Sequence, residues 1–139
     1  MTDGFSRPAA GHVPVLRLGD VLLVTLQGDL HDHMAEQLLQ DIGEAITGNR
    51  ATGVVINISG VEIVDSFLGR VLAEIAAKAR LLAAQTVVAG MRPAVAITLV
   101  ELGLTLPGLR TALTTEDALR LLGATDPVLR PGGTRPGSP

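Results

Sequence analysis

Residues 53–67 read GVVINISGVEIVDSF, a pattern in which a short apolar strand is followed by the start of a helix. The first half is rich in β-branched residues and opens on a glycine, which is typical of a buried strand. Beyond Phe67 the apolar residues recur every three or four positions, which predicts an amphipathic helix. These residues are Leu68, Val71, Leu72, Ile75, Ala79 and Leu82.

Ser66 falls at the predicted start of that helix, and we expect it to be the N-cap. Its hydroxyl would then lie close to the unpaired amides and the positive end of the helix dipole. A phosphate at this position finds hydrogen-bond donors, whereas the neighbouring Asp65 repels it. Ser66 is therefore a candidate site of covalent modification. The alternative is that Asp65 and Ser66 only cap the helix.

Strands and helices alternate along most of the chain. A hairpin is predicted over Val13–Leu18 and Val21–Gln27, with Gly19-Asp20 as its turn, and later strands over Gln85–Ala89 and Leu109–Leu113. Helices are expected from Asp32 to Gly48-Asn49, after Ser66, over Pro93–Leu102 and after a Thr114 cap to Leu122. This order predicts an α/β fold, with a mixed and mostly parallel sheet of about five strands and about four helices packed against it.

The predicted helix over Pro93–Leu102 is apolar almost all round, because only Thr98 and Glu101 interrupt it. Such a helix is expected to be covered on more than one side. In a domain of this size we expect its outer side to meet another subunit. The alternative is a helix embedded within one subunit.

Length and composition limit the classes of function. The 139 residues suit one domain, expected over 13–122, between a flexible arm (1–12) and a disordered Pro/Gly-rich tail (123–139). A net charge of −3 and an aromatic content of 1% argue against a nucleic-acid partner. Without cysteine the chain has no disulfide, thiol nucleophile or cysteine zinc site. It has no apolar run long enough to span a membrane and no signal-peptide pattern, so we expect a cytoplasmic protein.

Three segments carry a resemblance to a known family. They are DLHD at 29–32, VEIVDSF at 61–67 and GMRPAVAITLVELG at 90–103. Together they resemble a STAS domain, the fold of anti-sigma factor antagonists, and within it the scaffold subunits of the stressosome. The similarity spans about Val13 to Leu122. Asn57 departs from the family pattern, which usually has aspartate there, and this difference is expected to alter contacts near the site.

The resemblance implies a non-enzymatic signalling scaffold without a cofactor, a metal or catalytic residues. Such scaffolds self-associate, assemble with sensor-bearing STAS paralogues and sequester a serine/threonine switch kinase. The kinase leaves after phosphorylating the scaffold, and a serine phosphatase reverses the modification. The short segment before the first predicted strand favours the scaffold subunit over the sensor-bearing one. The alternative is a freestanding anti-sigma factor antagonist that binds its kinase one to one.

Carried over to this sequence, the resemblance makes Ser66 the phosphorylated residue and Thr98 a secondary candidate. The surface expected to meet the partner comprises Asp65, Phe67, Arg70, His31 and Asp32.

Other chemistries are weakly supported by the residues. Ser66, Asp65 and His31 or His33 supply the residue types of a hydrolytic triad, but no Gly-x-Ser-x-Gly elbow surrounds the serine. The cluster His31-Asp32-His33 offers ligands for a metal ion, but it lacks the distant ligand that a metal site needs. Asp32 is better explained as a helix cap.

No phosphate-binding glycine motif is present, which argues against a nucleotide site. Arg70, Glu74 and Lys78 recur at four-residue steps, which predicts a solvated, salt-bridged stripe that flanks Ser66.

Overall fold

A computed structural model of the chain describes residues 12–28, 30–103 and 109–123. The expected arm before His12 and the expected tail after Gly123 lie outside these residues. The elements are β1 (Val15–Leu18), β2 (Val21–Thr25), α1 (Asp32–Asn49), β3 (Gly53–Asn57), α2 (Ser66–Leu81), β4 (Gln85–Ala89), α3 (Pro93–Glu101), β5 (Leu109–Ala112) and α4 (Thr115–Leu122).

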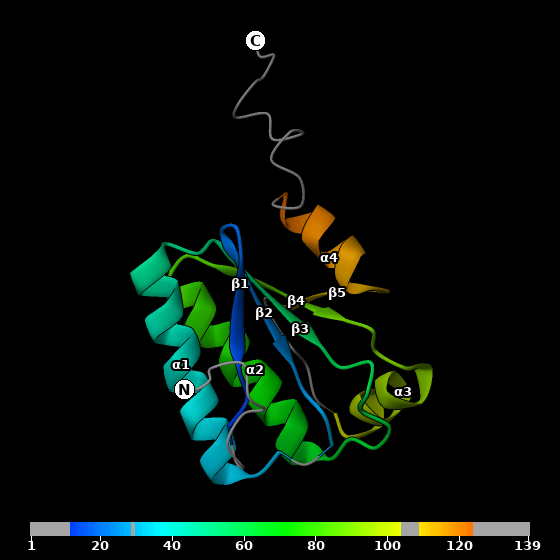
Figure 1. The fold of residues 1–139 in the computed structure, drawn as a ribbon. Helices are drawn as coiled ribbons and strands as arrows, with labels where there is room; N and C mark the ends of the chain where they lie inside the picture. The colour runs from blue at the N-terminus through cyan, green and yellow to red at the C-terminus, as the bar shows by residue number, and fades with distance from the viewer. Residues whose placement is uncertain (1–11, 29, 104–108, 124–139) are drawn as a thin grey trace, which may run out of the picture.

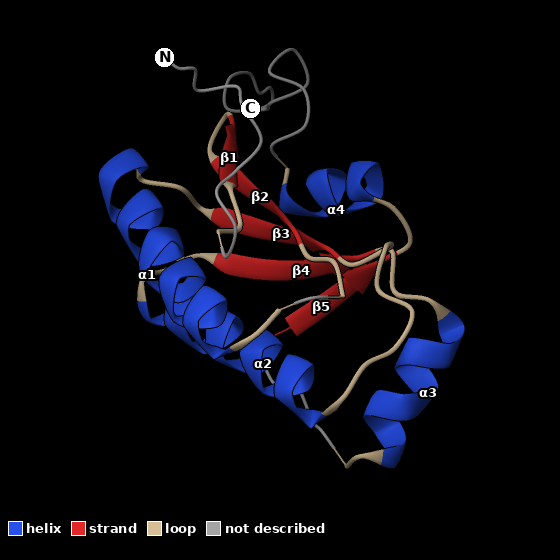
Figure 2. Ribbon diagram, turned by 60° about the horizontal axis from the view of Figure 1, so that its bottom comes forward, coloured by secondary structure: helices blue, strands red, loops and turns tan. Residues whose placement is uncertain are grey.

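The five strands form one sheet in the order β1-β2-β3-β4-β5. Strands β1 and β2 form the predicted antiparallel hairpin, with Leu18 opposite Val21, and every other pair is parallel. Helices α1 and α2 cover one face of the sheet, α4 covers the other, and α3 lies beyond one end of the strands (Figures 1 and 2). The predicted α/β class, with a mixed and mostly parallel five-stranded sheet and four helices, is confirmed.

The core is built from aliphatic side chains, as a sequence without tryptophan or tyrosine requires. Alternate strand residues point to opposite faces, so each central strand contributes to two clusters. Val54 and Ile56 of β3 pack toward α1 and α2, whereas Val55 packs toward Ala118 of α4. Because the central strands are buried on both faces, their sequence is apolar without alternation.

Helix α3 corrects one expectation. Only Val95 and Leu99 are buried among its residues, while Ile97 and Val100 are 58% and 76% exposed. The alternative of a helix embedded within one subunit is therefore wrong for the isolated chain, because α3 packs through one side only. That its outer side meets another subunit stays a prediction.

The predicted helix boundaries at Pro93 and Thr114 are confirmed. Pro93 is the first residue of α3, where its missing amide costs no intrahelical bond. The Thr114 hydroxyl accepts a 3.0 Å hydrogen bond from the amide of Asp117 and so caps α4. Within the described ranges, no helix has the length and apolar character needed to cross a membrane.

Candidate functional site

The N-terminus of α2 is capped by Asp65, which corrects the prediction that Ser66 is the N-cap. Asp65 has an extended backbone, and its Oδ1 accepts a 3.0 Å hydrogen bond from the amide of Leu68. Ser66 is instead the first residue inside the helix, and it is exposed. A carboxylate is a strong acceptor at the positive end of a helix, which explains why the aspartate takes the capping position.

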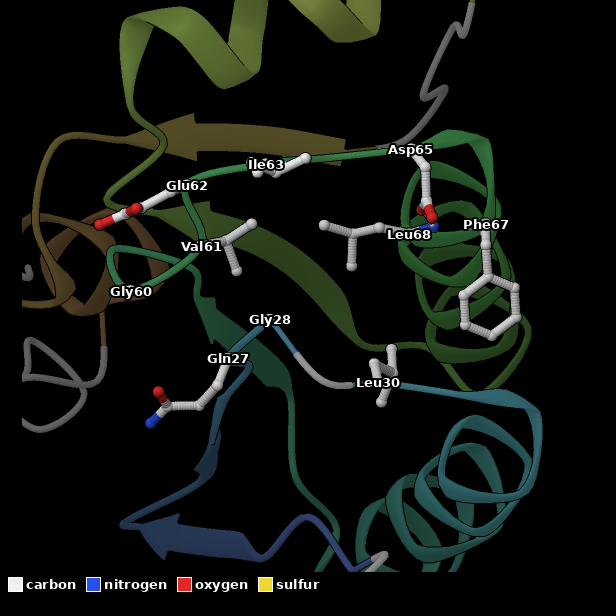
Figure 3. A pocket seen from close by; sticks show the side chains of 10 residues that line it. All are labelled: Gln27, Gly28, Leu30, Gly60, Val61, Glu62, Ile63, Asp65, Phe67 and Leu68. Atoms are coloured by element: carbon white, nitrogen blue, oxygen red, sulfur yellow. Dashed lines mark hydrogen bonds between the residues drawn. The ribbon is translucent and has the colours of Figure 1, made fainter.

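A groove of about 420 Å³ opens beside this helix start. It lies beyond the carboxyl ends of β2 and β3, between the segment that precedes α1 and the loop that joins β3 to α2. In Figure 3, Val61 and Leu68 point toward each other across the floor, and Leu30 lies on the opposite side. The other lining residues are Gln27, Gly28, Gly60, Glu62, Ile63, Asp65 and Phe67.

The groove is apolar inside and acidic at its rim. Its apolar lining is contributed by leucine, valine, isoleucine and phenylalanine side chains, whereas Glu62 and Asp65 are the charged residues among the described ones that line it. Ser66 does not line the groove, but it lies between two residues that do, Asp65 and Phe67. A charge added to Ser66 would therefore alter the rim of the groove.

A second hollow of about 370 Å³ is lined by residues of both α1 and α2, and Phe67 lines this hollow as well as the groove. The Arg70 guanidinium lies 5.9 Å from the centre of the Phe67 ring. The predicted salt bridges of the Arg70-Glu74-Lys78 stripe are wrong, since these residues form none of the ion pairs in the described part of the chain. Arg70 is drawn over the aromatic ring instead, which is a known arrangement for a cation.

Asp32 also lines this second hollow, but it does not cap α1. His31 occupies the N-cap position without a side-chain hydrogen bond, and Asp32 is the first helical residue. The Asp32 carboxylate in the first turn still interacts favourably with the positive end of the helix dipole, so it stabilises the helix start without capping it. Both His31 and Asp32 are exposed.

Hydrogen bonds with Asn57, with the end of β4 and with the start of α3 fix the beginning of the loop between β3 and α2. The side chain of Asn57 accepts a 3.1 Å hydrogen bond from the amide of Ser59, and the amide of Ile58 donates to the carbonyl of Ala89 at 2.9 Å. The side chain of Arg92 reaches across from the start of α3, where its Nε donates to the carbonyl of Ser59 at 3.1 Å. Asn57, the departure from the family pattern, thus takes part in the turn that starts this loop.

Thr98, the secondary candidate, lies apart from Ser66 on α3. Its hydroxyl donates a 2.9 Å hydrogen bond to the carbonyl of Ala94 within the same helix. A hydroxyl in this arrangement satisfies its own hydrogen-bonding needs locally.

The alternative chemistries gain no support from the geometry. Across residues 12–28, 30–103 and 109–123, neither His31 nor His33 hydrogen-bonds Ser66 or Asp65, so the residues of a hydrolytic triad are not assembled. The same residues contain no group of three His, Cys, Asp or Glu side chains arranged to hold a metal ion.

Among the residues that analysis of the sequence did not assign to the site are Gln27 and Leu30, which line the groove, and Arg92, which contacts the loop beside it. One general signal was present, because ligands of open α/β sheets bind beyond the carboxyl ends of the strands, where Gln27 and Leu30 follow β2. Nothing local in the sequence indicates that Arg92 contacts a carbonyl 33 residues earlier.

Comparison with known proteins places this geometry in context. Residues 12–118 match the STAS domain. The chain is 28% identical over 107 residues to the RsbT co-antagonist protein RsbRD of Bacillus subtilis, which is 76% of this chain and 38% of that protein. The chain thus spans about two fifths of the length of this relative.

Two solved structures are similar over nearly their whole length. A serine-to-glutamate variant of RsbS from Moorella thermoacetica is 43% identical, with a TM-score of 0.70, over 79% of this chain and 93% of that one. A second match is a chain from a solved structure of the stressosome, which is described as a signal integration and transduction hub. It is 44% identical with the same TM-score, over 78% of this chain and 95% of that one. The chain belongs to the STAS domain family.

Proposed function

We propose that this protein is a non-enzymatic scaffold of a stressosome-like assembly, which holds a serine/threonine switch kinase and releases it when Ser66 is phosphorylated. The observation that carries the proposal is the exposed Ser66 at the start of α2, beside a groove with an apolar floor. The similarity to RsbS and to a stressosome chain, both above 40% identity, supports the same role.

The position of Ser66 suits a phosphate. An α-helix leaves its first amides without intrahelical acceptors. Asp65 accepts from the amide of Leu68 through its side chain and from that of Gly69 through its carbonyl. The amides of Ser66 and Phe67 are left, within the described residues, to meet a new anion. The fold therefore tolerates the modification.

Phosphorylation of Ser66 should weaken the binding of a docked partner more than it weakens the fold. Phosphorylation adds about −1.5 to −2 charges next to the Asp65 carboxylate. Unit charges ~4 Å apart repel by about 1 kcal/mol in water and about 4 kcal/mol at an effective dielectric constant near 20. A partner whose apolar surface fills the groove must also desolvate the dianion. Since each 1.4 kcal/mol changes affinity tenfold, a few kcal/mol suffice to release a partner of micromolar affinity.

The partners follow from the same assignment. We expect self-association, assembly with sensor-bearing STAS paralogues and reversal of the modification by a serine phosphatase. The relative RsbRD is a co-antagonist protein, in keeping with a role in binding rather than catalysis. We also expect this role in the cytoplasm.

Reconstitution with the cognate switch kinase tests the proposal. The wild-type protein should acquire one phosphate, on Ser66, and lose the kinase as it does so. Ser66→Ala should stay unlabelled and hold the kinase in the presence of ATP. Ser59→Ala, which removes another exposed serine from the adjoining loop, is the matched control and should behave like the wild type. Stoichiometric labelling of Ser66→Ala contradicts the assignment.

Solution mass separates the scaffold from a freestanding antagonist. A large particle, formed alone or with a sensor-bearing STAS paralogue, supports the scaffold. A monomer or dimer in every mixture, with one kinase bound per chain, supports the antagonist.

A further inference from the structure

The loop from Ser59 to Asp65 forms one wall of the groove and presents Ser66. Two buried valines, Val61 and Val64, anchor it from inside. Its polar contacts are concentrated at its two ends. The amide of Val61 donates to the carbonyl of Ile58 at 2.9 Å, and Asp65 caps α2. Between them, residues 62–64 form no backbone–backbone hydrogen bond within the described chain.

Arg92 connects this loop to a different part of the molecule. It is the N-cap residue of α3, and its side chain extends back to the loop. The Nε atom donates to the carbonyl of Ser59 at 3.1 Å, and Nη2 lies 4.0 Å from Oε2 of Glu62. Figures 1 and 2 both show the loop running alongside α3.

Of the two contacts, the hydrogen bond should matter more. The ion pair with Glu62 is long, and both side chains are half exposed or more, a setting in which such pairs contribute little. The bond from a charged donor to a backbone carbonyl is directional and fixes the place of the chain itself. The neighbouring turn is tight as well, because a Cβ on Gly90 would lie 2.9 Å from Cβ of Ser59.

We propose that Arg92 is a positioning residue for the Ser66 site, holding the Ser59–Asp65 loop against the start of α3 so that the serine is presented in one conformation. The functional half of this proposal rests on the proposed function. Arg92 does not itself line the groove, and its described contacts are with Ser59 and Glu62 of the loop, so it acts on Ser66 through the loop. The arrangement also makes the loop sensitive to whatever displaces α3.

Hydrogen exchange measures the tether directly. In Arg92→Ala, the hydrogen-bonded amides of Ser59 and Val61 should exchange about three- to tenfold faster than in the wild type, since tenfold corresponds to 1.4 kcal/mol. Exchange in α1 and β2 should not change. Arg92→Lys keeps the charge but loses the fork of donors, so it should give an intermediate rate. Unchanged loop exchange in Arg92→Ala overturns the proposal.

Arg110→Ala is the matched control. Arg110 is also exposed, and it donates one side-chain hydrogen bond, to Oε1 of Gln85 at the opposite end of β4. Its removal should leave loop exchange at the wild-type rate. Acceleration equal to that of Arg92→Ala would show a general effect of lost charge and would overturn the proposal.

Phosphorylation kinetics test the functional half. With the cognate kinase, Arg92→Ala should raise KM for Ser66 about three- to tenfold, Arg92→Lys should restore part of it, and Arg110→Ala should match the wild type. Faster exchange with unchanged kinetics would reduce Arg92 to a structural brace and overturn the positioning role. If wild-type Ser66 acquires no phosphate, the proposed function and this functional half fail together, whereas the exchange result still decides whether the tether exists.

Discussion

The amide of Leu68 donates a 3.0 Å hydrogen bond to Oδ1 of Asp65, so the residue before Ser66, and not the serine, caps helix α2. This division of labour leaves the serine hydroxyl exposed at the helix start. The capping carboxylate of Asp65 and the hydroxyl of Ser66, the proposed phosphorylation site, therefore belong to adjacent residues, and each can be removed by itself.

Replacing Asp65 by alanine should lower the free energy of unfolding by about 1 kcal/mol, because the amide of Leu68 loses its acceptor. Asp65→Asn keeps a capping oxygen and should lose less. Ser66→Ala, at the exposed first helical position, should stay within about 0.5 kcal/mol of the wild type. Urea denaturation followed by circular dichroism measures all three. Equal losses for Asp65→Ala and Ser66→Ala would argue against the capping assignment.

Gly90 and Gly103 form a matched pair for testing how tightly the turn after β4 packs against Ser59. Both have φ values above +70°, where any side chain is strained by about 1–2 kcal/mol. A Cβ on Gly90 would also lie 3.2 Å from Cα of Ser59, whereas one on Gly103 meets no described atom within 4 Å.

Gly90→Ala should therefore destabilise the protein by about 2–4 kcal/mol and Gly103→Ala by about 1 kcal/mol. Chemical denaturation gives both values. Equal losses would mean that the Gly90 turn has room for a side chain.

At Thr86, in contrast to Gly90, a substitution should stabilise the protein. This residue of β4 is 1% exposed, and its hydroxyl has no hydrogen-bond partner among the described residues. Thr86→Val replaces the unsatisfied group with a methyl of similar size and should raise the free energy of unfolding by about 1 kcal/mol. Thr111→Val, on the exposed part of β5, should change it little. A loss of stability in Thr86→Val would indicate a hydrogen bond to water at this site.

The outer face of α3 offers a test of self-association. Val100→Lys should leave the stability of the fold unchanged, since the side chain is already 76% exposed, but should reduce the mass of the assembly. Leu81→Lys is the control, because Leu81 is similarly exposed, at 87%, but lies on α2 and not on α3. Sedimentation over a range of concentrations measures both. A wild-type chain that is monomeric throughout, alone and with STAS paralogues, would contradict the expected role of α3.

Much of the architecture could be predicted because it depends on local patterns. The β-branched run at Gly53–Asn57, the helical spacing after Ser66, the Gly19-Asp20 turn and Pro93 each specify an element by short-range sterics and hydrogen bonding, and alternation of elements specifies a mostly parallel sheet. The place of Ser66 near a helix start was predictable for the same reason.

What the sequence could not supply is the set of contacts between distant segments. Whether Asp65 or Ser66 caps α2 depends on backbone geometry that both residues permit locally. The apolar composition of α3 does not reveal which side packs, since only Val95 and Leu99 among its residues are buried. The bond from Arg92 to Ser59 exists because parallel β3 and β4 end at the same edge of the sheet, and only the folded sheet brings residues 33 positions apart within hydrogen-bonding distance.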